Sequence, residues 1–461
     1  MKRNFLINVS LWMVLTLAAC DGPDATLPTP QPTTALPTHT APPPVTTTAT
    51  PLPQATPTKA ESPTEAPTPE ANTPPINSLA PSEPITLSHI YMLDATGGWA
   101  IGQGGEALDD HILKTNDGAA TWEDVTPPQP LDVAASLGQA AAPFFLDGDT
   151  AWVTYYDRTA GPLSIPLAIW RTDDGGESWA ASAPLELPGT ADYHQISDLY
   201  FADKGTGWAL MHLGVGMSHD YMAVYGTTDG GATWDRLIDP DADGGLAMSC
   251  GKTGMAFANE STGWVLGDCG GVVPGTPYLY RTDDGGQTWA LSELPAPADV
   301  PTLFESDNFD YACGANWLGV LSRTESVLIV RCLDYNASAN QGWLYTTDDG
   351  GETWSANALP GTYNNVGFII NADFLSLAEG WIVSDGDAGG GYLQHTTDGG
   401  ATWTLVKKLG WIGQLNFVDS QTGWAVAQAC PDADCFTRLV ALVDTADGGG
   451  KWNEIKPVIA P

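Results

Sequence analysis

The sequence predicts an all-β fold, a seven-bladed β-propeller with four-stranded blades, preceded by a disordered Pro/Thr-rich spacer. Three observations predict it. An eight-residue segment ending in Trp recurs seven times, a Gly-Trp or similar Trp motif precedes six of the copies, and the copies follow one another at broadly regular intervals. Self-similarity at a period of roughly 50 residues, with four short strands per repeat, is typical of propeller blades.

Composition narrows the function classes before any motif is considered. The chain has 461 residues, with 55 Asp and Glu against 17 Lys and Arg, so its formal net charge is −38. Nucleic-acid binders need Lys and Arg to neutralise phosphates, so this class is excluded. The 43% of hydrophobic residues excludes disorder over the whole length.

Residues 1–19 form an export signal. Lys2 and Arg3 precede an apolar stretch at 5–17, and Leu-Ala-Ala-Cys ends at Cys20. This ending resembles the bacterial lipoprotein signal, which implies cleavage before Cys20 and lipid attachment to that residue. An ordinary signal peptide or a short membrane anchor stays open. The expected location is extracytoplasmic, on a bacterial membrane at the cell surface or in the periplasm.

Residues 20–85 comprise the lipidated Cys20 and a disordered linker rich in Pro and Thr. Positions 21–85 hold 18 of the 36 prolines and no aromatic residue. Such a segment cannot bury enough apolar surface to offset the entropy lost on ordering. We expect a passive tether that holds residues 86–461 away from the membrane.

Residues 86–461 are predicted to be the propeller. The seven segments share an Asp-Gly or Asp-Gly-Gly turn, in which Gly supplies positive φ and Asp accepts backbone N–H groups. These aspartates are expected to be structural, and each following Trp to be buried between blades. The Asp and Trp pairs are Asp117 and Trp122, Asp174 and Trp179, Asp229 and Trp234, Asp284 and Trp289, Asp349 and Trp354, Asp398 and Trp403, and Asp447 and Trp452.

The segment resembles the Asp box of sialidases, sortilin-type receptors and related propellers. Paired with the Gly-Trp-Ala-Val motif, seen at Trp424 and as Gly-Trp-Ala-Leu at Trp208, it is similar to the photosystem II stability/assembly factor family. This resemblance implies an extracytoplasmic, anchored scaffold without catalytic activity. The expected partners are a protein or a glycan at the propeller rims, and a monomer is expected.

Six cysteines remain after Cys20, and their places in the repeat predict three disulfides. Cys250 and Cys269 have the same spacing as Cys313 and Cys332, and both pairs fall at the same blade positions. Cys430 and Cys435 flank a short loop of blade seven. Free thiols are the alternative, which suits an exported chain poorly.

A catalytic interpretation is the alternative to the scaffold. A sialidase needs an Arg triad, a Tyr nucleophile with a Glu partner and an Asp acid/base, and its Arg-Ile-Pro motif is absent here. Other Asp-box glycosidases use a carboxylate pair between two propellers, and the chain is long enough for only one. The sequence therefore predicts a non-enzyme, with a sialidase-type or other glycoside hydrolase as the alternative.

Two further sets of residues are candidate sites. In the photosystem factor family, to which this chain is similar, basic residues on the blades form a partner-binding patch. The resemblance implies a partial patch at Lys114, Arg171 and Arg281, which lie at one register before boxes one, two and four; solvated strand ends are the alternative. Asp239, Asp241 and Asp243 match D-x-D-x-D-G, which can surround a hard cation. No cofactor is required, and Ca²⁺ is the candidate ligand; an acidic surface turn is the alternative.

Overall fold

A computed structural model describes residues 76–461, except 106, 133, 160–166, 188–193, 217–218, 241, 269–276, 306–309, 337–338, 361–368, 387–388, 432–434 and 436. The described residues form strands and turns without an α-helix, so the predicted all-β class is confirmed. Among them no helix has the length and hydropathy to span a membrane. The predicted signal peptide, Cys20 and most of the predicted spacer lie outside the described residues.

The strands form seven sheets in sequence order, and each sheet is one blade. Blades one to three contain, in order, β1 (Ile85–Met92), β2 (Gly98–Gly104), β3 (His111–Thr115), β4 (Thr121–Asp124); β5 (Gln139–Phe145), β6 (Ala151–Asp157), β7 (Trp170–Thr172), β8 (Ala180–Ala181); β9 (Gln195–Phe201), β10 (Gly207–Gly216), β11 (His219–Thr227) and β12 (Asp235–Ile238).

Blades four and five contain β13 (Gly251–Phe257), β14 (Gly263–Asp268), β15 (Leu279–Thr282), β16 (Ala290–Leu291); β17 (Tyr311–Val320), β18 (Ser326–Asp334), β19 (Ala339–Thr347) and β20 (Ser355–Ala358). Blades six and seven contain β21 (Ile369–Phe374), β22 (Gly380–Asp385), β23 (Gly391–Thr396), β24 (Thr404–Leu409); β25 (Ile412–Phe417), β26 (Gly423–Ala429), β27 (Leu439–Thr445) and β28 (Asn453–Ile455). Strand β29 (Val458–Ile459) follows.

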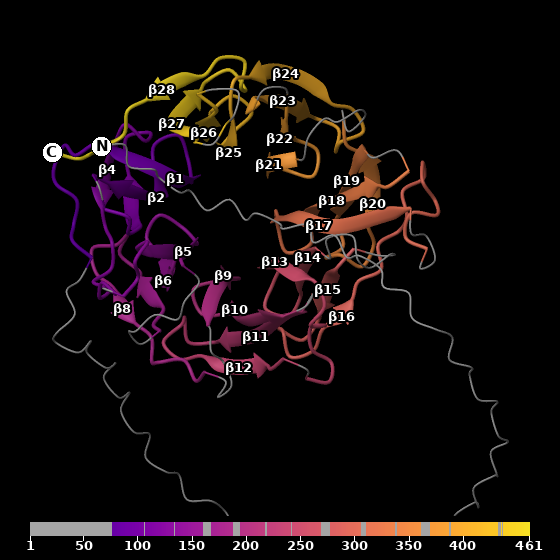
Figure 1. Ribbon diagram of the computed structural model, residues 1–461, viewed down its shortest axis with the longest axis horizontal. Coiled ribbons are helices and arrows are strands. Elements are labelled where there is room, and N and C mark those ends of the chain that lie inside the picture. The colour runs from indigo at the N-terminus through magenta and orange to yellow at the C-terminus, as the bar shows by residue number, and fades with distance from the viewer. Residues whose placement is uncertain are drawn as a thin grey trace, which may run out of the picture. The chain divides into compact units, whose positions relative to one another are not determined.

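The first strand of every blade is its inner strand, and the seven inner strands surround the axis of a ring (Figure 1). Inner strands of neighbouring blades contact one another, as β21 does with β25 and β9 with β13. Within each blade successive strands pair antiparallel, so each turn between a third and a fourth strand lies on the same rim. These turns are the seven Trp-ending segments.

Neighbouring blades are joined by a repeated aromatic contact. The Trp that opens the second strand stacks on the Phe that ends the first strand of the next blade. The ring centroids of Trp152 and Phe201 are 3.6 Å apart, and those of Trp208 and Phe257 are 3.5 Å apart. Many of the indole N–H groups also donate to the next blade, as Trp152 Nε1 does to the Gly230 carbonyl at 2.8 Å.

Blade five shows how the fold tolerates the loss of that Trp. Val327 occupies the position, and it is fully buried. Trp317, on the inner strand β17, packs instead against Phe374 of blade six, with ring centroids 5.9 Å apart. An indole from a different strand therefore fills the same space between blades.

The ring is closed by residues that follow blade seven. Strand β29 pairs parallel with β4, so blade one becomes a five-stranded sheet, and the Ile459 carbonyl also accepts the Ser82 N–H at 3.0 Å. Residues just before blade one pair with the same segment, because the Ile85 N–H donates to the Pro457 carbonyl at 3.2 Å and the Ile459 N–H to the Glu83 carbonyl at 2.9 Å.

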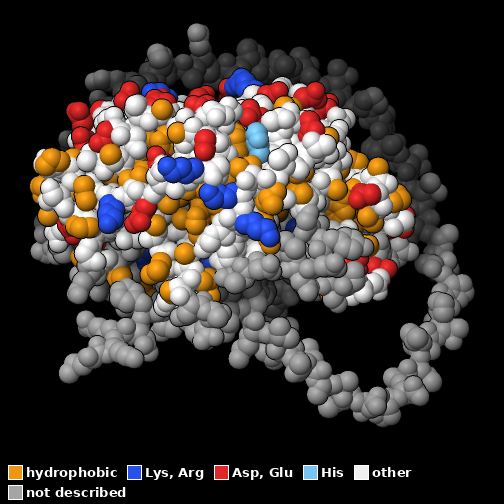
Figure 2. Space-filling model, turned by 90° about the horizontal axis from the view of Figure 1, so that it is seen from above, with side chains coloured by type: hydrophobic (Ala, Val, Ile, Leu, Met, Phe, Trp, Pro, Cys, Tyr) orange, Lys and Arg blue, Asp and Glu red, His pale blue; other side chains and the backbone are white. Residues whose placement is uncertain are grey.

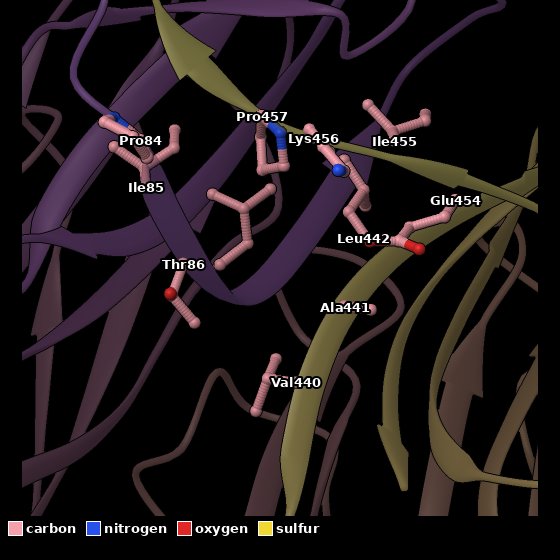
Figure 3. A pocket seen from close by; sticks show the side chains of 11 residues that line it. Pro84, Ile85, Thr86, Val440, Ala441, Leu442, Glu454, Ile455, Lys456 and Pro457 are labelled. Carbon is pink, nitrogen blue, oxygen red and sulfur yellow. The ribbon is translucent and has the colours of Figure 1, made fainter.

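The closing junction leaves a pocket of about 300 Å³ (Figure 3). Most of its lining is apolar, with Leu442 on one side and Ile85 on the other, and Glu454 and Lys456 lie at its border. In the other blades the segment after the fourth strand leads to the inner strand of the next blade. After β28 the chain continues into β29 instead.

Two predicted disulfides are formed. Cys313 on β17 faces Cys332 on β18 across the strand pair, and Cys430 bonds Cys435. Cys250 is also disulfide-bonded, and its predicted partner Cys269 lies outside the described residues.

Candidate functional site

The inner edge of the ring carries a set of side chains that join some of the blades to the next one. In blades six and seven, Asn or Gln side chains accept the backbone N–H groups of the following inner strand. Asn371 Oδ1 accepts the Leu415 N–H at 2.9 Å, and Gln414 Oε1 accepts the Ile90 N–H at 2.9 Å. Two residues further along, Asn416 accepts the Met92 N–H. We call these side chains the inner staples.

Two inner staples are carboxyl groups instead of amides. Asp198 of blade three occupies the position of Asn371 and Gln414, and its Oδ2 accepts the Met255 N–H at 2.9 Å. Asp373 of blade six occupies the position of Asn416 and accepts the Phe417 N–H. Both side chains remain partly exposed at the inner edge.

Burial raises the pKa of both carboxyl groups. The pKa of Asp198 rises from 3.8 to about 7, opposed by its bond from Met255 and by the charge of His212. That of Asp373 also rises to about 7, opposed by bonds from Phe417 and Phe374. A carboxyl group with this pKa exchanges its proton near neutral pH, which is what acid–base catalysis requires.

Aromatic rings occupy the inner edge of blades one to three. Phe144 and Tyr200 lie with ring centroids 5.0 Å apart, and Tyr91 packs against Phe145 at 5.0 Å. Burial raises the pKa of Tyr91 to about 12, with a further contribution from the charge of Asp198. This argues against Tyr91 as a nucleophile, since its phenolate is scarce at neutral pH.

The Asp boxes, by contrast, use their carboxylates within their own turns. In the second box Asp174 Oδ1 accepts from the Thr172 hydroxyl at 2.8 Å and the Ser178 N–H at 2.9 Å, and Oδ2 accepts from the Ser178 hydroxyl at 2.5 Å. Bonds from Ser178 and Thr172 lower the Asp174 pKa to about 2. Boxes one to six all make these three bonds. In the seventh, Lys451 supplies only its N–H.

The three residues of the candidate basic patch contact the protein itself. Arg171 donates to the Gly230 carbonyl of the next blade at 3.0 Å, and its charge pairs with Asp173 at 2.8 Å. Arg281 makes the same contacts with Gly351 at 3.2 Å and Asp283 at 2.8 Å. Lys114 Nζ lies 5.2 Å from the ring centroid of Trp99. The two arginines thus lie at junctions between blades, while Lys114 contacts a Trp of its own blade.

The candidate calcium loop is described only in part. Asp241 lies outside the described residues, and the Asp239 carboxylate pairs with Arg236 at 2.8 Å. No group of three or more His, Cys, Asp or Glu in the described part of the chain has the arrangement of a metal site.

The surface of the ring is acidic. Figure 2 shows Asp and Glu side chains along the upper border of that view, while Lys and Arg are fewer and lie among uncharged groups. This follows from the composition, because residues 86–461 hold 49 acidic and 14 basic residues. Such a surface favours neutral or cationic ligands over anionic ones.

The fold and the seven boxes define the class: the chain is an Asp-box β-propeller. The BNR/Asp-box repeat family matches residues 345–356, within the fifth box and its flanks. A solved structure, from an analysis of two prolyl endopeptidases, superposes with a TM-score of 0.50 over 82% of this chain and 50% of that one. At 9% identity this likeness concerns the fold alone.

Within this class, the curated relatives of the chain include xyloglucanases. Xyloglucanase Xgh74A of Acetivibrio thermocellus is 23% identical over 297 residues, covering 60% of this chain and 32% of its own length. A Paenibacillus xyloglucanase is 24% identical over 305 residues, covering 61% of this chain and 26% of its own. The chain thus spans about a third or less of these relatives.

A second relative is the photosystem II assembly lipoprotein Ycf48 of Synechococcus, 29% identical over 146 residues, or 31% of this chain and 36% of its own. The predicted resemblance to this group is confirmed, but the xyloglucanase matches extend over about twice as much of the chain. This finding overturns the prediction of a non-catalytic scaffold and of a non-enzyme, and it favours the alternative.

Sequence reasoning missed Asp198 and Asp373. They lie in the Gln195–Phe201 and Ile369–Phe374 strands, away from every motif. An alignment of the repeats at the residue just before the strand-ending Phe would have shown the difference, because blade six has Asp373 where blade seven has Asn416.

Proposed function

We propose that this chain is a glycan-active enzyme, a glycoside hydrolase whose reacting carboxyl groups are Asp198 and Asp373. The observation that carries the proposal is the use of carboxyl groups at positions where equivalent staples of blades six and seven are amides. An amide holds the neighbouring N–H without the cost of burying an acid. A function beyond that hydrogen bond accounts for the choice of Asp.

The chemistry follows from the state of these groups. A carboxyl group protonated near pH 7 can donate its proton to a glycosidic oxygen as the bond to the anomeric carbon breaks. An ionised carboxylate can take a proton from the water that forms the new bond to that carbon. The raised pKa of both aspartates suits them to this exchange.

For the substrate we propose a neutral β-glucan of the xyloglucan class. The support is the likeness to xyloglucanases over 60% of the chain and the acidity of the ring, which disfavours sialylated and uronic-acid glycans. The ring would meet the glycan at its inner edge and rims. We further propose that the enzyme is a monomer and acts without a metal; activity should survive EDTA, and Ca²⁺ should add stability only if it binds at Asp239 and Asp243.

We also propose that the enzyme is exported and anchored through a lipid on Cys20, with the Pro/Thr-rich segment as a tether. The sequence of residues 1–20 supports this. Labelling with a radioactive fatty acid in the native host, compared with a Cys20→Ser variant, tests it. Label retained on the variant would contradict it.

The test of activity uses the full chain on a panel of soluble polysaccharides, with reducing ends as the measured product. Xyloglucan should be cut, and the Asp198→Asn and Asp373→Asn variants should lose most of the activity while remaining folded. The repeat supplies the control, because Asn371 and Asn416 show that the same positions accept amides. Full activity in both variants, or no cleavage of any glycan by the wild type, would sink the proposal.

A further inference from the structure

Five of the seven inner strands have a β-bulge at one and the same repeat position. Each time, the residue four places before the end of the strand is skipped in the pairing with the second strand. A bulge leaves one residue outside the ladder and redirects its side chain. The skipped residues are Ser88, Ser197, Thr253, Asn316 and Ile370.

All five skipped residues are exposed. They lie on the strands that surround the ring axis (Figure 1), so we take their exposed side chains to be accessible at the inner edge. The corresponding residues of the two remaining blades, Ala141 and Gly413, are small. The inner edge therefore presents short, mostly polar side chains at one level of the ring.

Four of these side chains have hydrogen-bonding capacity to spare. The hydroxyl groups of Ser88 and Ser197 donate to second-strand carbonyls only at 3.3 and 3.4 Å, and that of Thr253 to Ala315 at 3.3 Å. These long bonds leave acceptor capacity on each oxygen, and at Ser88 the ring nitrogen Nδ1 of His89 also lies 3.3 Å from the hydroxyl. The side-chain amide of Asn316 adds donors and an acceptor.

The described residues of the inner strands carry no accessible positive charge. Among the described residues of the seven inner strands the one Lys or Arg is Lys252, which is buried. Its ammonium group donates to the carbonyls of Asp220, Ser249 and Cys250 at 3.1 to 3.2 Å. A carboxylated or sulfated ligand would find no cation here, whereas an uncharged one would find hydroxyl and amide groups.

We propose that Ser88, Ser197, Thr253 and Asn316 form a binding subsite for an uncharged, hydroxyl-rich saccharide. The proposal names the ligand class of the hydrolase above and rests on it for the saccharide. Asp198 follows Ser197 directly in the chain, so a sugar held by this subsite would lie beside one of the two carboxyl groups.

The experiment measures affinity, not turnover, by calorimetry with a xyloglucan oligosaccharide and with trigalacturonate as the anionic counterpart. To prevent cleavage, all proteins carry Asp198→Asn and Asp373→Asn. Ser88→Ala, Ser197→Ala, Thr253→Val and Asn316→Ala are each added alone and then together. Ala141 holds the equivalent repeat position of blade two, on a strand that has no bulge, so circular dichroism checks that each variant is folded. Ser355→Ala, on the outer strand β20, is the matched surface control.

We expect each single change to weaken xyloglucan-oligosaccharide binding about 3- to 10-fold, the loss of one neutral hydrogen bond. The combined variant should bind about 100-fold more weakly or not at all, with unchanged circular dichroism. Ser355→Ala should bind as the parent protein does. Equal affinity in the combined variant, tighter binding of trigalacturonate, or no binding of the neutral oligosaccharide by the parent protein would overturn the proposal.

The two proposals fail separately. Wild-type protein that binds the oligosaccharide through these four residues but never cuts it would refute the hydrolase and leave the subsite standing. Wild-type protein that cuts xyloglucan while the four substitutions leave affinity unchanged would refute the subsite alone.

Discussion

The Asp boxes and the inner strands are both repeated seven times, yet they differ in how they use aspartate. In the boxes the same residue types recur, and each carboxylate is held by Thr, Ser or backbone groups of its own turn. On the inner strands one position holds Asp, Asn, Gln or an unrelated residue, depending on the blade. The uniform part builds the ring, and we infer that the variable part gives it a specific function.

The sharpest test of this comparison exchanges Asp for Asn in both regions. Asp373→Asn should lower the rate of xyloglucan cleavage about 100- to 10,000-fold, as loss of an acid–base group does, without lowering the melting temperature. Asp229→Asn, in the third box, should lower the melting temperature and leave the cleavage rate unchanged. The reason is that the Asp229 carboxylate accepts hydrogen bonds from the Thr227 and Thr233 hydroxyl groups. Its cost is about 1–2 kcal/mol of unfolding free energy. Similar effects of both variants on both properties would break the comparison.

The two regions should also respond to pH in opposite directions. The pKa of Asp373 is about 7 in the folded protein, against an ordinary value of 3.8. The stability that this residue contributes is therefore fully present below about pH 4 and is lost as the pH rises to about 7. Asp373→Asn should therefore gain stability over the wild type across this interval, by at most about 4 kcal/mol. Asp174 behaves in the opposite way. Hydrogen bonds from Ser178 lower the pKa of its carboxyl group, so the stability that Asp174 contributes is lost as the pH falls below about 4.

Urea unfolding midpoints of wild type, Asp373→Asn and Asp174→Asn, measured between pH 3 and pH 8, check this prediction. The difference between wild type and each variant removes the titration of all other groups. Parallel curves for wild type and Asp373→Asn would show that this carboxyl group titrates alike in the folded and unfolded chain.

A smaller effect distinguishes the two roles of Asp373, as a hydrogen-bond acceptor between blades and as a titrating carboxyl group. Asp373→Ala removes the acceptor of the Phe417 N–H as well as the carboxyl group, whereas Asp373→Asn keeps an acceptor. At pH 4, where the acid of the folded protein is protonated, the alanine variant should be less stable than the asparagine variant by about 1–3 kcal/mol. Equal stability of the two variants in urea at that pH would remove the structural role.

The smallest effect compares two equivalent Trp residues. Trp208 Nε1 donates to the Gly285 carbonyl at 2.8 Å, whereas the buried Nε1 of Trp264 has no partner among the described residues. Phe at either position loses similar ring area, but only at Trp208 does it also remove a hydrogen bond. Trp208→Phe should thus cost about 1 kcal/mol more than Trp264→Phe in thermal unfolding.

The sequence predicts the ring because its signals are local. A turn such as the one around Asp229 needs glycine at two successive positive-φ positions, Gly230 and Gly231, and this need leaves a visible pattern. The one box that departs from this pattern can also be recognised in the sequence: in the first box Ala119 adopts a φ of 73° at the position where the other boxes have Gly. Blade count and strand order follow from such turns.

The candidate site could not be predicted in this way. Whether an inner-strand residue such as Ser197 points into the ladder or out of it depends on a bulge, and bulges shift the alternation on which sequence patterns rely. The partner of Asp198 is an N–H group on another blade, far along the chain. Ring closure by Val458 and Ile459 was missed because so short a strand carries no periodic signal.

Closure by β29 has a consequence for the order of events during synthesis. The strand that completes blade one lies at residues 458–459, so it emerges from the ribosome after all seven blades. Until then the outer edge of β4 is unpaired, and blades seven and one meet through contacts such as the bond from the Ile90 N–H to the Gln414 side chain. We therefore expect a translating chain to complete all seven blades before β29 adds its backbone hydrogen bonds to the contact between the first blade and the last.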